Sequence, residues 1–180
     1  DNETTGNTAV GYGTGYRNVT GQNNTWVGYG AGLGASGQSN SSNVGVGMNA
    51  LTSITTAAES VMVGHLAGDA ITTGGSNTGL GKGALGTTVS GTRMVAVGQG
   101  ALGNGAITSN HSVAVGMDAG LSLTSGTVVA MGYNAAVAMT TGVGNVAIGS
   151  GSLAAHTTGN ENIAIGSGAA SGLTIGQRNV

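Results

Sequence analysis

The chain has 180 residues, of which 38 are Gly and none is Pro, Cys or Phe, and only 6% are charged, against roughly a quarter of the residues in an average soluble domain. A net charge of −2, with four scattered Lys and Arg residues, argues against nucleic acid as a partner, because phosphate binding needs clustered basic side chains. The low charge also argues against a disordered chain, the absence of Pro excludes collagen, and no apolar run is long enough to span a membrane.

A Gly preceded by a large aliphatic residue recurs along the whole chain. These anchor glycines are Gly11, Gly28, Gly47, Gly64, Gly81, Gly98, Gly116, Gly132, Gly149 and Gly166. Their spacing of 16 to 19 residues, most often 17, is typical of a solenoid in which each repeat makes one coil. The composition is uniform, so the sequence predicts a single repeat domain over residues 1–180.

The residues before each anchor glycine predict a short β-strand in every repeat. A large aliphatic residue comes directly before the Gly, a β-branched residue stands two places earlier, and a mostly small residue lies between them. This alternation predicts a strand with one buried face. We expect the aliphatic side chains to face the core, so that Val10→Asp or Ile148→Asp would bury a charge.

An Asn precedes the predicted strand in six repeats, where stacked copies can form a ladder of amide hydrogen bonds. These residues are Asn7, Asn24, Asn43, Asn77, Asn145 and Asn162. After the anchor glycine, most repeats carry an Ala three residues on, and then an aliphatic residue followed by a Thr-Thr-Gly-like turn. The sequence therefore predicts an all-β parallel solenoid of about ten 17-residue coils, each with a strand, a Gly turn, a second short strand and a second Gly turn.

The motifs of enzyme chemistry are weak in this sequence. The dinucleotide-binding pattern G-x-G-x-x-G begins at Gly32, Gly81 and Gly98, but no long helix is predicted to follow it. The histidines occupy three different repeat columns without acidic neighbours at ligand spacing, so we expect solvated or turn histidines and no metal or other cofactor. They are His65, His111 and His156. The six carboxylates are dispersed as well, and we expect no enzymatic activity.

Four of the five aromatic residues fall in the first two repeats, and they are our candidate ligand-binding residues: Tyr12, Tyr16, Trp26 and Tyr29. Aromatic faces can stack on sugars while the polar tips form hydrogen bonds. The alternatives are an end cap that shields the first coil, or an internal plug formed by Trp26. Tyr12 and Tyr29 also belong to the variable column directly after the anchor glycine, which we expect to face solvent or a ligand.

The repeats are poor in large apolar residues, which bears on the oligomeric state. Three such side chains per repeat do not by themselves offset the conformational entropy lost when a repeat becomes ordered. The columns of small residues would let other chains approach closely. We therefore expect an oligomer, most simply a parallel homotrimer.

Two repeats carry a specific resemblance. The sequences Asn-Val-Ala-Ile-Gly at 145–149 and Asn-Ile-Ala-Ile-Gly at 162–166 resemble the N-[SV]-[VT]-A-[IV]-G unit in the head repeats of trimeric autotransporter adhesins of the YadA type. The first repeat, with its Thr-Thr-Gly turns, is similar to repeats of bacteriophage tail-fibre proteins. The resemblance implies a left-handed parallel β-roll, three chains per fibre, and attachment to a cell-surface glycan or protein receptor. It also implies an extracellular location, on a bacterial surface or a phage virion.

The repeats depart from the adhesin-head unit in length and at four positions. They are longer, and Trp26, Gly45, Met62 and Gly79 occupy the position that is usually Ala. Two other functions remain open beside attachment. One is a purely structural extracellular filament or sheath protein. The other is an ice-binding solenoid, because regular Thr columns can order water, although the Thr-Thr pairs fall at turns and are missing from several repeats.

Overall fold

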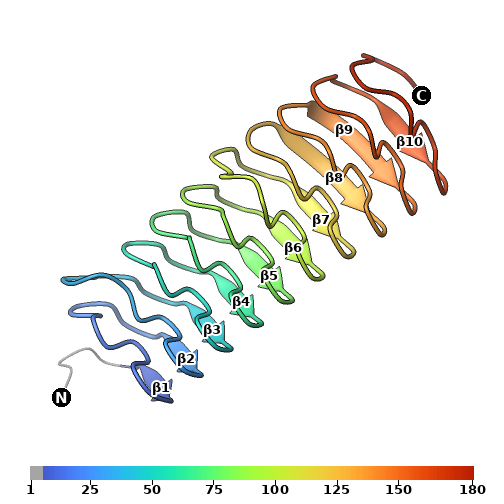
Figure 1. Cartoon of the computed structure of the whole chain (residues 1–180). Helices are drawn as coiled ribbons and strands as arrows, with labels where there is room; N and C mark the ends of the chain where they lie inside the picture. Colours follow the sequence, from blue (N-terminus) through green and yellow to red (C-terminus); the bar gives the residue numbers. More distant parts are fainter. Residues whose placement is uncertain (1–5) are drawn as a thin grey trace.

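The chain forms a rod of stacked coils, in a computed structural model that describes residues 6–180 (Figure 1). It is an all-β parallel solenoid, as the sequence predicts. Its strands form one ten-stranded parallel sheet in which each strand pairs with the next in chain order. They are β1 (Thr8–Val10), β2 (Thr25–Val27), β3 (Val44–Val46), β4 (Val61–Val63), β5 (Thr78–Leu80), β6 (Val95–Val97), β7 (Val113–Val115), β8 (Thr127–Met131), β9 (Val143–Ile148) and β10 (Ile163–Ile165).

The buried side of the sheet carries the small residues, so the expectation that the large aliphatic residues face the core is wrong. Successive side chains of a strand point to opposite sides, and the middle residues Ala114 and Ala130 are fully buried. Val10 is 58% exposed and Leu80 38% exposed, and Ile148 is half-buried on the same outer side. An Asp at position 10 or 148 would therefore lie on the outside of the coil.

The interior cannot hold a large side chain at the middle position of every strand, because side chains from the rest of each coil also point inward. The Ala three residues after the anchor glycine is buried in most coils, and a later column of larger side chains packs against it. That later column includes Ile54, Ile71, Ile107, Leu123, Met139 and Leu173. The core is thus a narrow, continuous stack along the axis of the rod.

The second predicted strand of each coil does not form among the described residues. Buried residues such as Leu85 and Leu102 have φ angles of 55° and 49°, in the left-handed region, and so interrupt the extended backbone that a strand needs. Hydrogen bonds between coils continue in this half, where the Leu85 N–H donates to the Ala101 carbonyl at 3.0 Å. The backbone is therefore paired without a regular ladder.

The anchor glycines follow the strands and stack closely on one another. Gly81 has a φ of +134°, and a Cβ added to it would lie 2.6 Å from the carbonyl oxygen of Gly98. Both the backbone angle and this contact require Gly. The recurring Gly in the sequence therefore marks the positions where the backbones of consecutive coils touch directly.

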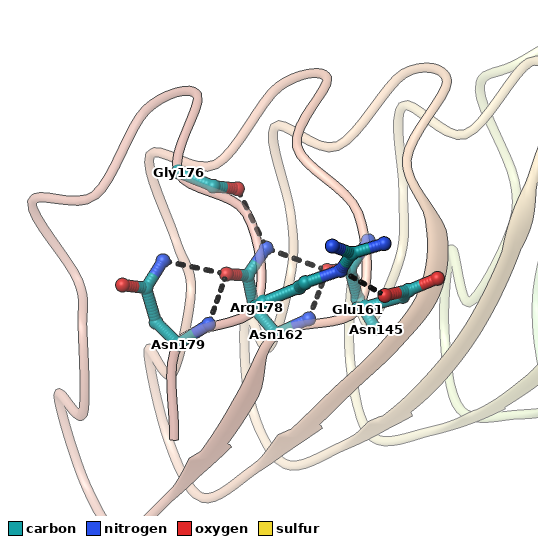
Figure 2. Close-up of polar contacts among 6 residues, drawn as sticks. All are labelled: Asn145, Glu161, Asn162, Gly176, Arg178 and Asn179. Atoms are coloured by element: carbon teal, nitrogen blue, oxygen red, sulfur yellow. Dashed lines mark hydrogen bonds and ion pairs between the residues drawn. The ribbon is translucent and has the colours of Figure 1, made fainter.

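Asparagines join consecutive coils, as the sequence predicts (Figure 2). The Asn162 backbone N–H and side-chain Nδ2 both donate to Asn145 Oδ1, at 3.0 and 2.9 Å. Asn179 repeats the pattern on Asn162 Oδ1, at 3.1 and 2.8 Å. Asn162 Nδ2 also donates to the Gly176 carbonyl at 2.8 Å, near the end of its own coil. Each amide therefore closes one coil and attaches it to the next.

His156 is buried inside the rod, so the expectation of a solvated or turn histidine is wrong for this residue. It is 0% exposed and occupies the interior column that carries aliphatic residues in most other coils. Its Nε2 lies 3.0 Å from the Gly159 carbonyl oxygen, and a Cβ at Gly159 would come within 2.7 Å of that Nε2. Of the other histidines, His65 is half-buried and His111 is exposed.

Candidate attachment surfaces

The four aromatic candidates do not lie together on the surface. Trp26 is 1% exposed and fills the interior of the second coil. Glycines on three sides make room for the indole, since a Cβ at Gly15, Gly32 or Gly45 would collide with it. Trp26 therefore occupies the place of the internal plug that the sequence left as an alternative, and it is not part of an attachment surface.

Tyr12 and Tyr29 stack on each other outside the sheet. Their ring centroids are 5.6 Å apart with an interplanar angle of 16°, and the two residues are 79% and 58% exposed. They occupy neighbouring coils in the column after the anchor glycine, much of which is exposed, as expected. Since each ring covers one face of the other, their edges and hydroxyl groups have the freer access to a ligand.

The outer side of the sheet is an apolar surface along the whole rod, which we call the outer strip. It consists of two columns: Thr8, Thr25, Val44, Val61, Thr78, Val95, Val113, Val129, Val146 and Ile163, and Val10, Val27, Val46, Val63, Leu80, Val97, Val115, Met131, Ile148 and Ile165. None of these residues is charged. All of them are exposed or half-buried, and they lie on the same side of the sheet. Monomeric soluble proteins rarely expose contiguous apolar patches larger than a few hundred Å². The outer strip is therefore a candidate surface for contact with another molecule.

A second surface lies beyond the first turn, around Tyr16, Arg17 and Val19. Tyr16 and Val19 are 78% and 55% exposed, and Arg17 is exposed between them. The neighbouring coil contains the longest repeat, with 19 residues between its anchor glycines. Its additional length forms a loop at residues 34–37, which we call the insertion loop; Gly34 is buried and residues 35–37 are exposed. In Figure 1 the segment between β2 and β3 reaches further out than those of the next coils.

Hydrogen bonds hold the insertion loop against Arg17. The Arg17 N–H donates to the Leu33 carbonyl at 3.2 Å, and the Gln38 N–H donates to the Arg17 carbonyl at 3.4 Å. The guanidinium Nη1 donates to the Gly34 carbonyl at 3.3 Å. The candidate residues chosen from the sequence are all aromatic and do not include Arg17. The signals that could have found it are the single 19-residue spacing and the absence of any other Lys or Arg before Lys82.

Charged groups are few and mostly separate over the part of the chain that the structure describes. One ion pair is present there, in which Arg178 Nε lies 2.8 Å from Glu161 Oε2 on the exposed side of the last coil (Figure 2). Burial raises the pKa of Asp69 above its ordinary value of 3.8, while its own backbone hydrogen bond and the nearby His65 act in the opposite direction.

Searches for a metal site and for relatives give no further assignment. Within residues 6–180, no three His, Asp or Glu side chains lie close enough together to hold a metal ion. In the same range, no helix has the length and apolar character needed to cross a membrane. Compared with protein-family models, curated proteins and solved structures, the chain matches none of them.

Proposed function

We propose that this chain is a non-enzymatic module of a homotrimeric, extracellular surface fibre that attaches to a host or cell surface. The observation that carries the proposal is the outer strip, which is free of charge over all ten coils. A second and a third copy with the same coil spacing present matching apolar columns and bury them in a parallel assembly. The repeat resemblance favours the same two settings, an adhesin head on a bacterium or a phage tail fibre.

The remaining surface suits display of a receptor-binding site. Hydrogen bonds between coils run along the rod, so the backbone that carries the surface side chains is held in place. The exposed tyrosines near the amino-terminal end are repeated three times in a trimer. Multiple linked sites raise avidity by about 10² to 10⁴ over a single site, which strengthens weak contacts with a glycan or protein receptor.

Analytical ultracentrifugation of the parent and two variants tests the assembly. Val63→Asp places a charge on the outer strip, and we expect a monomer that keeps the β-sheet signal in circular dichroism. Val89→Asp is the control, because Val89 is 40% exposed but lies outside the strip, and we expect it to remain a trimer. A parent chain that is a stable, folded monomer at micromolar concentration contradicts the proposal.

Binding to cells tests the attachment role. We expect the trimeric parent and Val89→Asp to bind target cells, and the monomeric Val63→Asp to lose most of the binding because avidity is lost. Equal binding by monomer and trimer would contradict multivalent attachment.

A structural filament is the second candidate, and the Tyr12–Tyr29 stack favours it because these rings stabilise neighbouring coils without a ligand. A trimer that binds neither cells nor glycans would support this candidate. Ice binding has less support. Thr hydroxyl groups at the turns donate to carbonyls of the next coil, as in Thr55 to Thr72 at 2.8 Å, and these hydroxyl hydrogens are therefore not presented to ordered water.

A further inference from the structure

We infer that Tyr16, Arg17 and the insertion loop form the binding site for a sugar that carries a single carboxylate group, such as a sialic or uronic acid. The inference rests on the proposed function, since it assigns the receptor chemistry of an attachment module. It also places the site on other residues than the Tyr12–Tyr29 stack, beginning four residues after Tyr12 in the chain.

The position of the insertion loop is the first argument. In repeat proteins the coils share one backbone path, and insertions fall in loops that often lie on the binding face. Residues 35–37 are exposed, whereas Gln38 at the base of the loop is buried and pairs with Asn18 of the previous coil through a parallel bridge. The loop is thus exposed at its tip and fixed at its base.

The state of the Arg17 guanidinium is the second argument. It makes one hydrogen bond, to the Gly34 carbonyl at 3.3 Å, and no carboxylate pairs with it among the residues that the structure describes. Arg178 differs, because Glu161 occupies its guanidinium. Arg17 retains N–H groups that can meet both oxygens of a carboxylate, the geometry that guanidinium recognises best.

The ring of Tyr16 is the third argument. The stacked pair of the described residues is Tyr12 with Tyr29, so the 78% exposed Tyr16 ring keeps its faces free of other aromatic rings. An aromatic face packs against the apolar side of a sugar ring, and Val19, three residues further along the chain, is a second exposed apolar side chain.

Charge limits the ligand class. Arg17 is the single Lys or Arg of the first four repeats, whereas polyanions are bound through several Lys and Arg side chains. A carboxylate sugar matches one guanidinium and one aromatic ring. The Tyr12–Tyr29 stack has no such charge beside it in sequence and adjoins the outer strip through Val10, where the other copies of the proposed trimer lie.

Biolayer interferometry with matched oligosaccharides is the test. The probes are sialyllactose, lactose and a uronic-acid disaccharide, each displayed at the same density, with the intact trimer in solution. We expect the parent to bind the two acidic sugars at least about tenfold more tightly than lactose, since charge-assisted hydrogen bonds are the stronger ones. Added salt should weaken this preference.

Matched variants separate the contacts. Arg17→Gln should remove the preference for acidic sugars, and Tyr16→Ala should weaken binding to all three probes. The controls are Arg93→Gln and Tyr133→Ala, which change an exposed Arg and an exposed Tyr in regular coils, and both should bind as the parent does. Circular dichroism and sedimentation verify that each variant remains a folded trimer.

The outcomes distinguish this inference from the proposed function. Equal binding of acidic sugars and lactose, no binding of acidic sugars, or unchanged binding by Arg17→Gln would overturn the inference, even if the parent attaches to cells. Arg17-dependent binding of acidic sugars by a chain that is not a trimer would support the inference and contradict the trimeric fibre.

Discussion

The same interior column is filled in two different ways in the two halves of the rod. In the amino-terminal coils, β2 to β5, it reads Trp26, Gly45, Met62 and Gly79, so a large residue alternates with no side chain at all. In the carboxy-terminal coils, β6 to β10, every residue of the column is Ala: Ala96, Ala114, Ala130, Ala147 and Ala164. Trp26 and Met62 are nevertheless as buried as these alanines.

The difference shows that neighbouring coils share one interior volume. A Cβ at Gly45 would lie 2.7 Å from Trp26 Cε3, and a Cβ at Gly79 would lie 2.5 Å from Met62 Sδ. A large side chain therefore occupies the place of its own coil and of the next, and Gly in the next coil permits it. Where every coil carries Ala, each coil fills its own part of the interior. Trp26 with Gly45, and Met62 with Gly79, are thus pairs in which Gly compensates for the large residue of the preceding coil.

The largest effect is expected at an anchor glycine, a feature that both halves share. Gly81→Ala combines an unfavourable φ with the close approach to the Gly98 carbonyl, and we expect it to lower the free energy of unfolding by more than about 3 kcal/mol. Urea titration followed by circular dichroism measures this change. Gly83→Ala is the control, because Gly83 has a φ of +64° and no atom within 4 Å of an added Cβ. Left-handed backbone alone costs about 1–2 kcal/mol, so equal losses at both positions would exclude the contact as the cause.

A double-mutant cycle on Trp26 and Gly45 tests the compensating pairs. Trp26→Ala should destabilise the chain by about 3–5 kcal/mol through the cavity, and Gly45→Ala by about 1–3 kcal/mol through overpacking. In the double variant Gly45→Ala should no longer be harmful, so the combined loss should fall short of the sum by at least about 1 kcal/mol. Thermal and urea unfolding measure all four proteins. Additive losses would show that the two coils do not share their interior.

A second column, directly before the strand in most coils, carries Asn in some coils and other residues in the rest. Asn162→Ala removes the acceptor of the Asn179 amide and leaves the Gly176 carbonyl without its side-chain donor. We expect a loss of about 1–3 kcal/mol, because the 1% exposed Asn162 side chain makes several hydrogen bonds and each contributes about 0.5–1.5 kcal/mol. Met94 occupies the same column without an amide side chain and is 1% exposed. Its backbone N–H still donates to Asn77 Oδ1 at 3.0 Å, a bond that Met94→Leu retains, so this change should cost less than about 1.5 kcal/mol. A larger loss at Met94 than at Asn162 would mean that packing rather than hydrogen bonding dominates this column.

The smallest effect is expected at Asp69, outside the interior column. Burial raises the pKa of this carboxyl above 3.8, so ionisation is less favourable in the folded chain than in the unfolded one. Stability associated with the protonated form is complete below the ordinary pKa and is lost as the pH rises through the folded value. Asp69→Asn should therefore melt slightly higher than the parent at pH 7, and the difference should vanish towards pH 3.8. Melting curves over this pH range test it, and a variant that melts lower at pH 7 would contradict the direction.

The sequence by itself determined the coil, its period and its most constrained contacts. The anchor glycines and the asparagine column repeat at the coil length, and each repeat meets its equivalent in the next coil. Such contacts join identical positions, so their spacing along the chain is enough to reveal them. Ten copies made the pattern readable without knowledge of the width of the coil.

Only the tertiary structure decided which side of the strand is the inside. Strand alternation separates two faces, but the distance to the opposite wall of the coil selects the face with small residues for the interior and leaves Val10 outside. The same narrow interior holds Trp26 because Gly15, Gly32 and Gly45 leave space for its ring, and it holds His156 against Gly159. Arg17 and the insertion loop likewise meet across neighbouring coils. These features depend on volumes and contacts between non-equivalent positions, which a repeat pattern does not contain.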